Sequence, residues 1–82
     1  MKEIRFQLHM PAEIRAIDQS TALTILKATH RYAETGTGHT KALSGAFQGL
    51  VRLRVGNYRV LFDESEDSIT VHLIRDRRNT YR

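Results

Sequence analysis

The feature that most constrains the fold of this chain is a pair of alternating segments that meet at Gly56-Asn57. Residues 51–55 and 58–62 mostly alternate between side chains that suit a buried face and side chains that suit an exposed face, which is typical of half-buried strands. Glycine at the first central position suits a two-residue type II′ turn, so the segments are predicted to form a β-hairpin. The face expected to pack on the rest of the protein carries Val51, Leu53, Val55, Tyr58, Val60 and Phe62.

The opposite face of the hairpin is predicted to carry three arginines. With the turn at Gly56-Asn57, Arg54 pairs with Arg59, and Arg52 lies opposite Leu61. Like charges directly opposite each other in a sheet are unfavourable by about 0.2–1 kcal/mol. An anion on this face would remove the repulsion, and phosphate matches the planar arginine fork best. The hairpin therefore predicts a phosphate-binding face.

The segment before the hairpin predicts a strand and a short helix. Apolar residues alternate with polar ones from Ile4 to Leu8, which indicates a half-buried first strand. Pro11 suits the first turn of a helix, and Ile14 and Ile17 are its expected inner residues.

A second helix is predicted to begin after Ser20, a residue type that caps helix N-termini, and to end at Gly36, which can adopt the left-handed conformation. Apolar and small residues between these positions recur at the spacing of one helix face. Residues 36–49 contain four of the five glycines and are predicted to be mainly loop.

The remaining segments complete the predicted fold. Residues 63–68 form an acidic loop, and in the last strand Ile69, Val71 and Leu73 are expected to share one face. The predicted order is β-α-α-β-β-β. This order indicates an α+β fold with a curved antiparallel sheet and two N-terminal helices packed on one face.

Composition limits the classes of function. A chain of 82 residues, 40% of them hydrophobic, suffices for one small core, so residues 1–82 are predicted to form a single domain. The absence of cysteine excludes disulfides and a thiol nucleophile. No segment resembles a signal peptide or a membrane span, so we expect a cytoplasmic protein with no membrane partner.

Charge favours a polyanionic partner. Thirteen Lys and Arg residues, ten of them Arg, face nine Asp and Glu residues, which gives a net charge of +4. Without the four carboxylates of residues 63–67, thirteen cations face five anions, a charge of +8. Residues 75–82 concentrate four of the arginines around Tyr81, and arginine planes beside an aromatic ring suit single-stranded RNA. A solvated basic face and a packing role for Tyr81 are the alternatives.

Three segments of the chain resemble the RelE/ParE superfamily of toxins from bacterial type II toxin–antitoxin systems, on its RelE-like branch. They are Leu43-Ser44-Gly45, the hairpin from Leu50 to Phe62, and the segment from Asp76 to Arg82. The predicted order of helices and strands is similar as well. The resemblance implies an endoribonuclease that cuts mRNA in the A site of the 70S ribosome, a cognate antitoxin as its partner, and no cofactor.

The resemblance also implies roles for individual residues. Arg52 and Arg54 fall where such toxins carry basic residues, and Arg59 falls on the arginine held to stabilise the strained phosphate. Arg77 falls on the C-terminal arginine of the family. Tyr81 falls on the C-terminal tyrosine, which stacks on or orients the cleaved nucleotide.

The sequence does not decide which residues transfer protons. Asp76 stands where many relatives have a histidine, but a carboxylate beside several arginines stays ionised and is a weak base, which favours pairing with Arg75 or Arg78. His72 is expected on the same face as the hairpin arginines and is the second candidate. The remaining histidines lack a ligand-like spacing, so no metal site is expected.

Two alternative functions remain open. A ParE-like inhibitor of DNA gyrase is disfavoured because the segment between Pro11 and Asp18 is short. A catalytically inactive basic module that only binds nucleic acid would use the same arginines. For contact with an antitoxin, the candidate apolar residues on the second helix are Leu23 and Tyr32.

Overall fold

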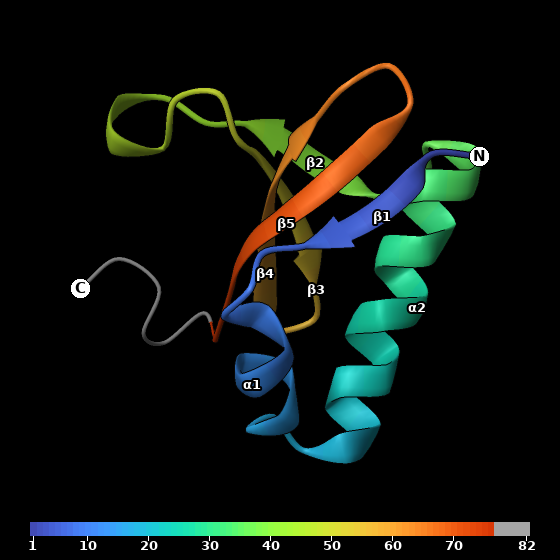
Figure 1. The fold of residues 1–82 in the computed structure, drawn as a ribbon, viewed down its shortest axis with the longest axis vertical. Coiled ribbons are helices and arrows are strands. Elements are labelled where there is room, and N and C mark those ends of the chain that lie inside the picture. The colour runs from blue at the N-terminus through green and yellow to red at the C-terminus, as the bar shows by residue number, and fades with distance from the viewer. Residues whose placement is uncertain (77–82) are drawn as a thin grey trace.

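Two α-helices and five strands make up residues 1–76, the part of the chain that the computed structural model describes (Figure 1). In chain order the elements are β1 (Glu3–Phe6), α1 (Met10–Arg15), α2 (Gln19–Thr35), β2 (His39–Ala42), a 3-10 turn (Gly45–Phe47), β3 (Val51–Val55), β4 (Tyr58–Glu64) and β5 (Ser68–Asp76). The α+β class and the two N-terminal helices agree with the prediction.

The strands form one mixed sheet in the order β1-β5-β4-β3-β2. The strands from β2 to β5 are antiparallel neighbours, whereas β1 runs parallel to β5. The prediction of a wholly antiparallel sheet is therefore wrong at this edge. Both helices separate β1 from the other strands in sequence, and a connection of this length allows β1 to join the far edge as a parallel neighbour.

Strand β2 lies in a segment that was predicted to be mainly loop. It pairs antiparallel with β3 over its whole length, and all four of its side chains are exposed. Its sequence, His-Thr-Lys-Ala, lacks the apolar alternation that signals a strand. This strand forms because its backbone pairs with the free edge of β3, and it has no buried face of its own.

The first strand is shorter than its alternating pattern predicts. It ends at Phe6, and Leu8 is fully exposed in the turn that precedes α1. Pro11 occupies the first turn of α1 as expected. Ile14 and Ile17 pack against the core, which confirms them as the inner residues of this segment.

The N-cap of helix α2 lies two residues earlier than predicted. Asp18, not Ser20, is the N-cap, and its Oδ2 accepts hydrogen bonds from the Thr21 backbone N–H at 3.3 Å and from the Ser20 hydroxyl at 2.7 Å. The bonds from Ser20 and Thr21 lower the pKa of Asp18. At the other end, Gly36 adopts φ 75° and donates its N–H to the carbonyl of Tyr32, which confirms the predicted C-terminus.

A β-bulge in β5 reverses the predicted alternation of the last strand. Leu73 pairs with Leu61, but Val71 pairs with Phe62, so His72 is the extra residue between them. Beyond the bulge the buried side chain is that of Ile74, and Leu73 faces the opposite side of the sheet. The expectation that Leu73 shares a face with Val71 is therefore wrong.

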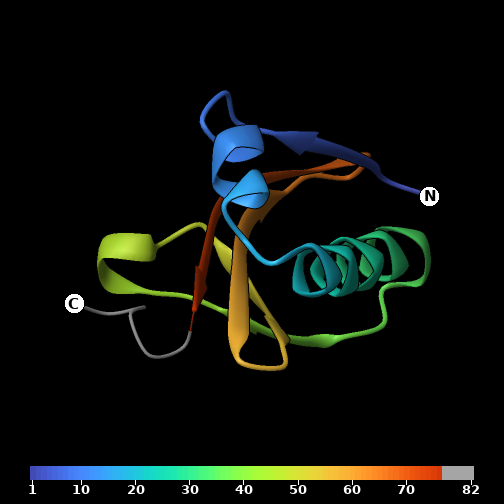
Figure 2. The same cartoon turned by 90° about the horizontal axis from the view of Figure 1, so that it is seen from below.

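Both helices cover the same face of the sheet, and Figure 2 shows α2 on one side of the sheet and the 3-10 turn on the other. The core between helices and sheet contains Met10, Ile25, Ala33, Leu53, Val60, Phe62, Ile69, Val71 and Ile74. Every hairpin residue predicted for this face lies in the core or packs against it, so that prediction is confirmed. Burying one such side chain contributes about 1.5–3 kcal/mol.

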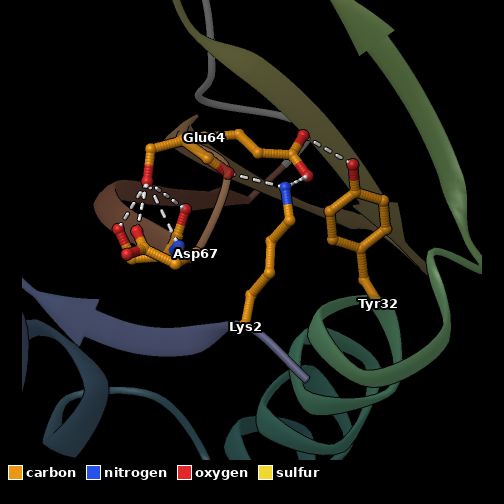
Figure 3. A network of polar contacts seen from close by, with 6 residues as sticks. Lys2, Tyr32, Glu64 and Asp67 are labelled. Atoms are coloured by element: carbon orange, nitrogen blue, oxygen red, sulfur yellow. Dashed lines mark hydrogen bonds and ion pairs between the residues drawn. The ribbon is translucent and has the colours of Figure 1, made fainter.

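A polar network joins α2 to the end of β4 and to the N-terminal segment (Figure 3). The Tyr32 hydroxyl donates to Glu64 Oε1 at 2.7 Å, and Lys2 Nζ donates to Glu64 Oε2 at 2.7 Å and to the Ser65 carbonyl at 2.6 Å. The ring of Tyr32 lies 5.3 Å from that of Phe62. Tyr32 is therefore an internal anchor of the fold and not the exposed contact residue that was expected.

The network shifts the pKa values of Tyr32 and Glu64. Burial, the hydrogen bond to Glu64 and the negative charge of Glu64 raise the pKa of Tyr32 to about 12. Burial favours a higher pKa for Glu64, but hydrogen bonds from Lys2 and Tyr32 and the charge of Lys2 outweigh it, so the pKa of Glu64 is lowered. The folded state therefore favours a neutral Tyr32 beside an ionised Glu64.

These shifts predict how stability depends on pH. The folded pKa of Tyr32 lies above its ordinary value of 10.0, so its contribution is complete below pH 10 and is lost as pH rises toward about 12. Tyr32→Phe is expected to lower the free energy of unfolding by about 1 kcal/mol at neutral pH and to lose less stability than the wild type at higher pH. Urea unfolding at a series of pH values measures both effects, and parallel curves above pH 10 would contradict this assignment.

Candidate nucleic-acid interface

The hairpin has the predicted register. Arg54 pairs with Arg59, and Arg52 pairs with Leu61. Gly56 has φ 58°, and within residues 1–76 only glycines have a positive φ, so Asn57 does not. A positive φ at the first central position alone agrees with the predicted type II′ turn. Because directly paired residues point to the same side of a sheet, all three arginines face away from the helices.

The neighbouring strands extend this arrangement across the sheet. His39 of β2 pairs with Arg54, and Arg75 of β5 pairs with Arg59, so one row of four basic side chains crosses four strands. In the next row, Lys41 pairs with Arg52. We call this surface the basic face; it comprises His39, Lys41, Arg52, Arg54, Arg59 and Arg75.

His39 and Lys41 were not predicted as site residues, because their segment was expected to be loop. They reach the site because β2 pairs with the edge of β3, which would otherwise be unpaired and which any short polar strand could occupy. Their positions follow from pairing with Arg54 and Arg52, and not from a pattern of their own.

The cations of the basic face differ in how they are neutralised. Arg75 Nη1 donates to Glu13 Oε1 of α1 at 2.7 Å and to the carbonyl of Ile74 at 3.0 Å. By contrast, no carboxylate of residues 1–76 forms an ion pair with Arg52 or Arg54. Arg54 is exposed, whereas Arg52 is half-buried and its Nε is buried without a hydrogen-bond partner in the described chain.

His72 lies on the same side of the sheet but at some distance from the arginine row. Its Nε2 is 2.5 Å from Oδ2 of Asp63, and its carbonyl accepts a hydrogen bond from His9 Nε2 at 2.9 Å. Asp63 follows Arg59 by four residues on β4, which places it about 13 Å away along an extended strand. The bulge therefore presents a carboxylate–imidazole pair at one end of the basic face.

The other sequence-predicted residues are placed differently. Asp76 pairs with Tyr58, in the row that faces the helices, and so lies on the opposite side of the strand from Arg59 and Arg75. Arg77 and Tyr81 lie outside the described residues. The structure thus brings Arg52, Arg54 and Arg59 together and separates Asp76 from them.

Residues 1–76 contain no group of three His, Cys, Asp or Glu side chains that could hold a metal ion. Neither helix of this part of the chain is long and apolar enough to cross a membrane.

The comparison with known proteins gives matches at the level of structure. No protein-family model and no characterised protein matches the sequence. A chain of the toxin–antitoxin complex RelBE2 from Mycobacterium tuberculosis matches with a TM-score of 0.81 and 14% identity, over 93% of this chain and 98% of that chain. A chain of the archaeal RelE-RelB complex from Pyrococcus horikoshii matches with a TM-score of 0.74 and 15% identity, over 96% and 98% of the two chains.

A third match comes from a different toxin–antitoxin pair. A chain of the YoeB-YefM complex from Staphylococcus aureus gives a TM-score of 0.72 at 12% identity, over 92% of this chain and 95% of that chain. The chain therefore has the RelE-like toxin fold that the resemblance implied. Identities this low establish the fold, and the activity has to be argued from the basic face.

The opposition of Arg54 and Arg59 predicts a gain of stability when one charge is removed. Arg54→Thr is expected to raise the free energy of unfolding by about 0.2–1 kcal/mol, because threonine suits a strand and ends the repulsion. The matched control is Arg5→Thr on β1, where the guanidinium lies 2.7 Å from Glu3 and no gain is expected. Urea unfolding measures both variants, and a less stable Arg54→Thr protein would contradict the repulsion.

Proposed function

We propose that this chain is the toxin of a type II toxin–antitoxin system and that it cuts mRNA on the ribosome. The observation that carries the proposal is the direct opposition of Arg54 and Arg59 on the sheet face that points away from the helices, with Arg52 in the adjacent row. This arrangement is unfavourable without an anion and complements the phosphates of RNA. The RelE-like fold, whose neighbours were solved as toxin–antitoxin complexes, supports the same function.

The chemistry of the proposed reaction needs the charge of the basic face. The 2′-oxygen of the RNA attacks the adjacent phosphorus and the bond to the 5′-oxygen breaks, which leaves a 2′,3′-cyclic phosphate and a 5′-hydroxyl. The phosphorane between these states carries extra negative charge on its non-bridging oxygens. Arg54 and Arg59 donate hydrogen bonds to these oxygens, and Arg52 holds the phosphate next to them. Electrostatic stabilisation of this kind is usually the largest catalytic contribution.

Two residues of the C-terminal segment complete the proposed site. The resemblance places Arg77 on the C-terminal arginine of the family and assigns Tyr81 to the cleaved nucleotide. A stacking contact with a base contributes about 1–3 kcal/mol to binding. The ribosome holds the message for in-line attack, so modest proton-transfer help from side chains suffices.

We assign proton transfer to His39 in preference to His72 and Asp76. His39 pairs with Arg54 and so lies in the same row as the groups that bind the phosphate. His72 lies further along the sheet and is held by Asp63, and Asp76 lies in the row that faces the helices. An imidazole can take up or release a proton near neutral pH, which this step requires.

The proposed setting follows from the substrate. Ribosomes and mRNA place the protein in the cytoplasm, where an acidic antitoxin chain would cover its positive charge until the toxin acts. No part of this mechanism uses a cofactor.

Removing the arginines tests the proposed function directly. Arg54→Ala and Arg59→Ala are each expected to lower cleavage of ribosome-bound message by about 100-fold or more, because the phosphorane loses a charged donor. Both side chains lie off the core face, so circular dichroism should stay unchanged. Arg15→Ala on α1 serves as the control, because Arg15 is an exposed arginine that does not belong to the basic face. The measurement is mapping of transcript ends after induction, with and without ribosomes.

Other outcomes of the same experiment would exclude the proposal. Intact transcripts together with broken DNA would indicate a gyrase inhibitor. Cleavage that continues at the wild-type rate in Arg54→Ala and Arg59→Ala would remove both residues from the site.

The assignment of the proton-transfer group has a separate test. His39→Gln is expected to lower cleavage by about 100-fold and to flatten its dependence on pH between about 5 and 8. His72→Gln should keep the wild-type profile, and His30→Gln, on the exposed side of α2, is the matched control. A flattened profile in His72→Gln alone would transfer the role to the pair with Asp63.

A further inference from the structure

Two cavities lie between α2 and the β2–β3 side of the sheet, and the larger of them adjoins the basic face at His39 and Arg54. The larger, of about 440 Å³, is lined by Ala28, Arg31, Thr37, Gly38, His39, Leu53 and Arg54. The smaller, of about 230 Å³, is lined by Thr21, Thr24, Ile25, Val55, Gly56, Asn57 and Tyr58. Both cavities follow β3, the larger at Leu53 and Arg54 and the smaller at Val55.

The cavities share one wall on α2, and together we call them the α2 groove. Thr21, Thr24, Ala28 and Arg31 recur at intervals of three and four residues, so they lie on one face of the helix. The ten residue steps from Thr21 to Arg31 span about 15 Å of helix. Three of these four side chains are small, which explains why the helix leaves the space above β3 unfilled.

The α2 groove combines an apolar floor with a cationic rim. Leu53, Val55 and Ile25 supply aliphatic surface, and Arg31, His39 and Arg54 supply the basic side chains. No Asp or Glu of residues 1–76 lines either cavity. Arg54 belongs to both the groove and the basic face, so the two surfaces are continuous at this residue.

We propose that the α2 groove binds an extended acidic segment of the partner protein, with an aliphatic side chain in the larger cavity and carboxylates on Arg31 and Arg54. The proposal rests on the proposed function, which supplies an antitoxin as the partner. Charge complementarity selects an acidic segment, and the aliphatic floor selects an apolar side chain between the carboxylates. RNA is disfavoured because unpaired bases bind mainly by stacking on aromatic rings, and the groove offers one ring in each cavity, His39 and Tyr58, beside a mainly aliphatic floor.

Occupation of the α2 groove would also block the basic face. A carboxylate bound to Arg54 competes with the RNA phosphate for the same guanidinium. Docking of the segment therefore inhibits cleavage by direct competition, and no change of conformation is required.

Peptide selection on the full chain tests the proposal. The probes are random displayed peptides of about a dozen residues, since about five extended residues already span 15 Å. Selected peptides are expected to carry Asp or Glu on both sides of Leu, Ile, Val or Met. Selection of peptides without carboxylates would overturn the proposal.

Variants then locate the bound peptide by fluorescence anisotropy. Arg31→Glu reverses a rim charge and Ala28→Leu fills the larger cavity, and each should weaken binding by about tenfold or more. Arg15→Glu, the same charge reversal on α1, should change the affinity by less than about twofold. Arg31 is exposed, so Arg31→Glu decides the question even where Ala28→Leu disturbs folding. Equal affinity for Arg31→Glu and Arg15→Glu would overturn the proposal.

Two further measurements separate this inference from the proposed function and from RNA binding. Arg31→Glu should still cleave ribosome-bound message, but the selected peptide should no longer inhibit it. Loss of affinity for single-stranded RNA equal to the loss for peptide would assign the groove to RNA and overturn the proposal. A wild-type protein that binds peptide in the groove yet cleaves no message would refute the proposed function and leave the peptide site standing.

Discussion

The opposition of Arg54 and Arg59 is fixed by the packing of the other face of the hairpin. Leu53 and Val60 pair with each other, are buried, and sit one position away from the arginine pair. A shift of one residue in register would turn every side chain of a strand to the other face and expose these core residues. Their burial contributes about 1.5–3 kcal/mol each, whereas the charge repulsion costs about 0.2–1 kcal/mol. The core therefore holds the arginines together against their own repulsion.

The rest of the sheet sets the limits of the basic face. Addition of β2 at one edge widens the face with His39 and Lys41. At the other edge Glu13 pairs with Arg75, whereas no carboxylate of residues 1–76 forms an ion pair with His39, Lys41, Arg52 or Arg54 on β2 and β3. Along β4, the buried Leu61 separates Arg59 from Asp63. The face is thus wide across the strands and short along them, which suits contact with a few consecutive phosphates.

The sequence predicted those parts of the fold whose cause lies within a single segment. The hairpin register followed from the alternation around Gly56-Asn57, which only Leu61 interrupts, and the end of α2 followed from Gly36. It did not predict β2, because that strand depends on the free edge of β3, nor the bulge at His72, because a bulge interrupts the alternation that prediction relies on. The candidate site shows the same difference. The alternation of the hairpin strands predicted the positions of Arg52, Arg54 and Arg59, whereas His39 reaches the site only through the pairing of β2 with β3.

The contacts that anchor α2 are separate from the surfaces that would bind RNA or a partner. The hydrogen bond from the Tyr32 hydroxyl to Glu64 anchors the C-terminal half of the helix, and the Ile25 side chain packs in the core. These contacts fix the position of α2, and its small side chains leave the α2 groove open beside β3. Arg54 then lies where the groove meets the basic face. A partner seated there needs only to occupy one guanidinium to exclude RNA, so its removal would restore the site at once, without refolding.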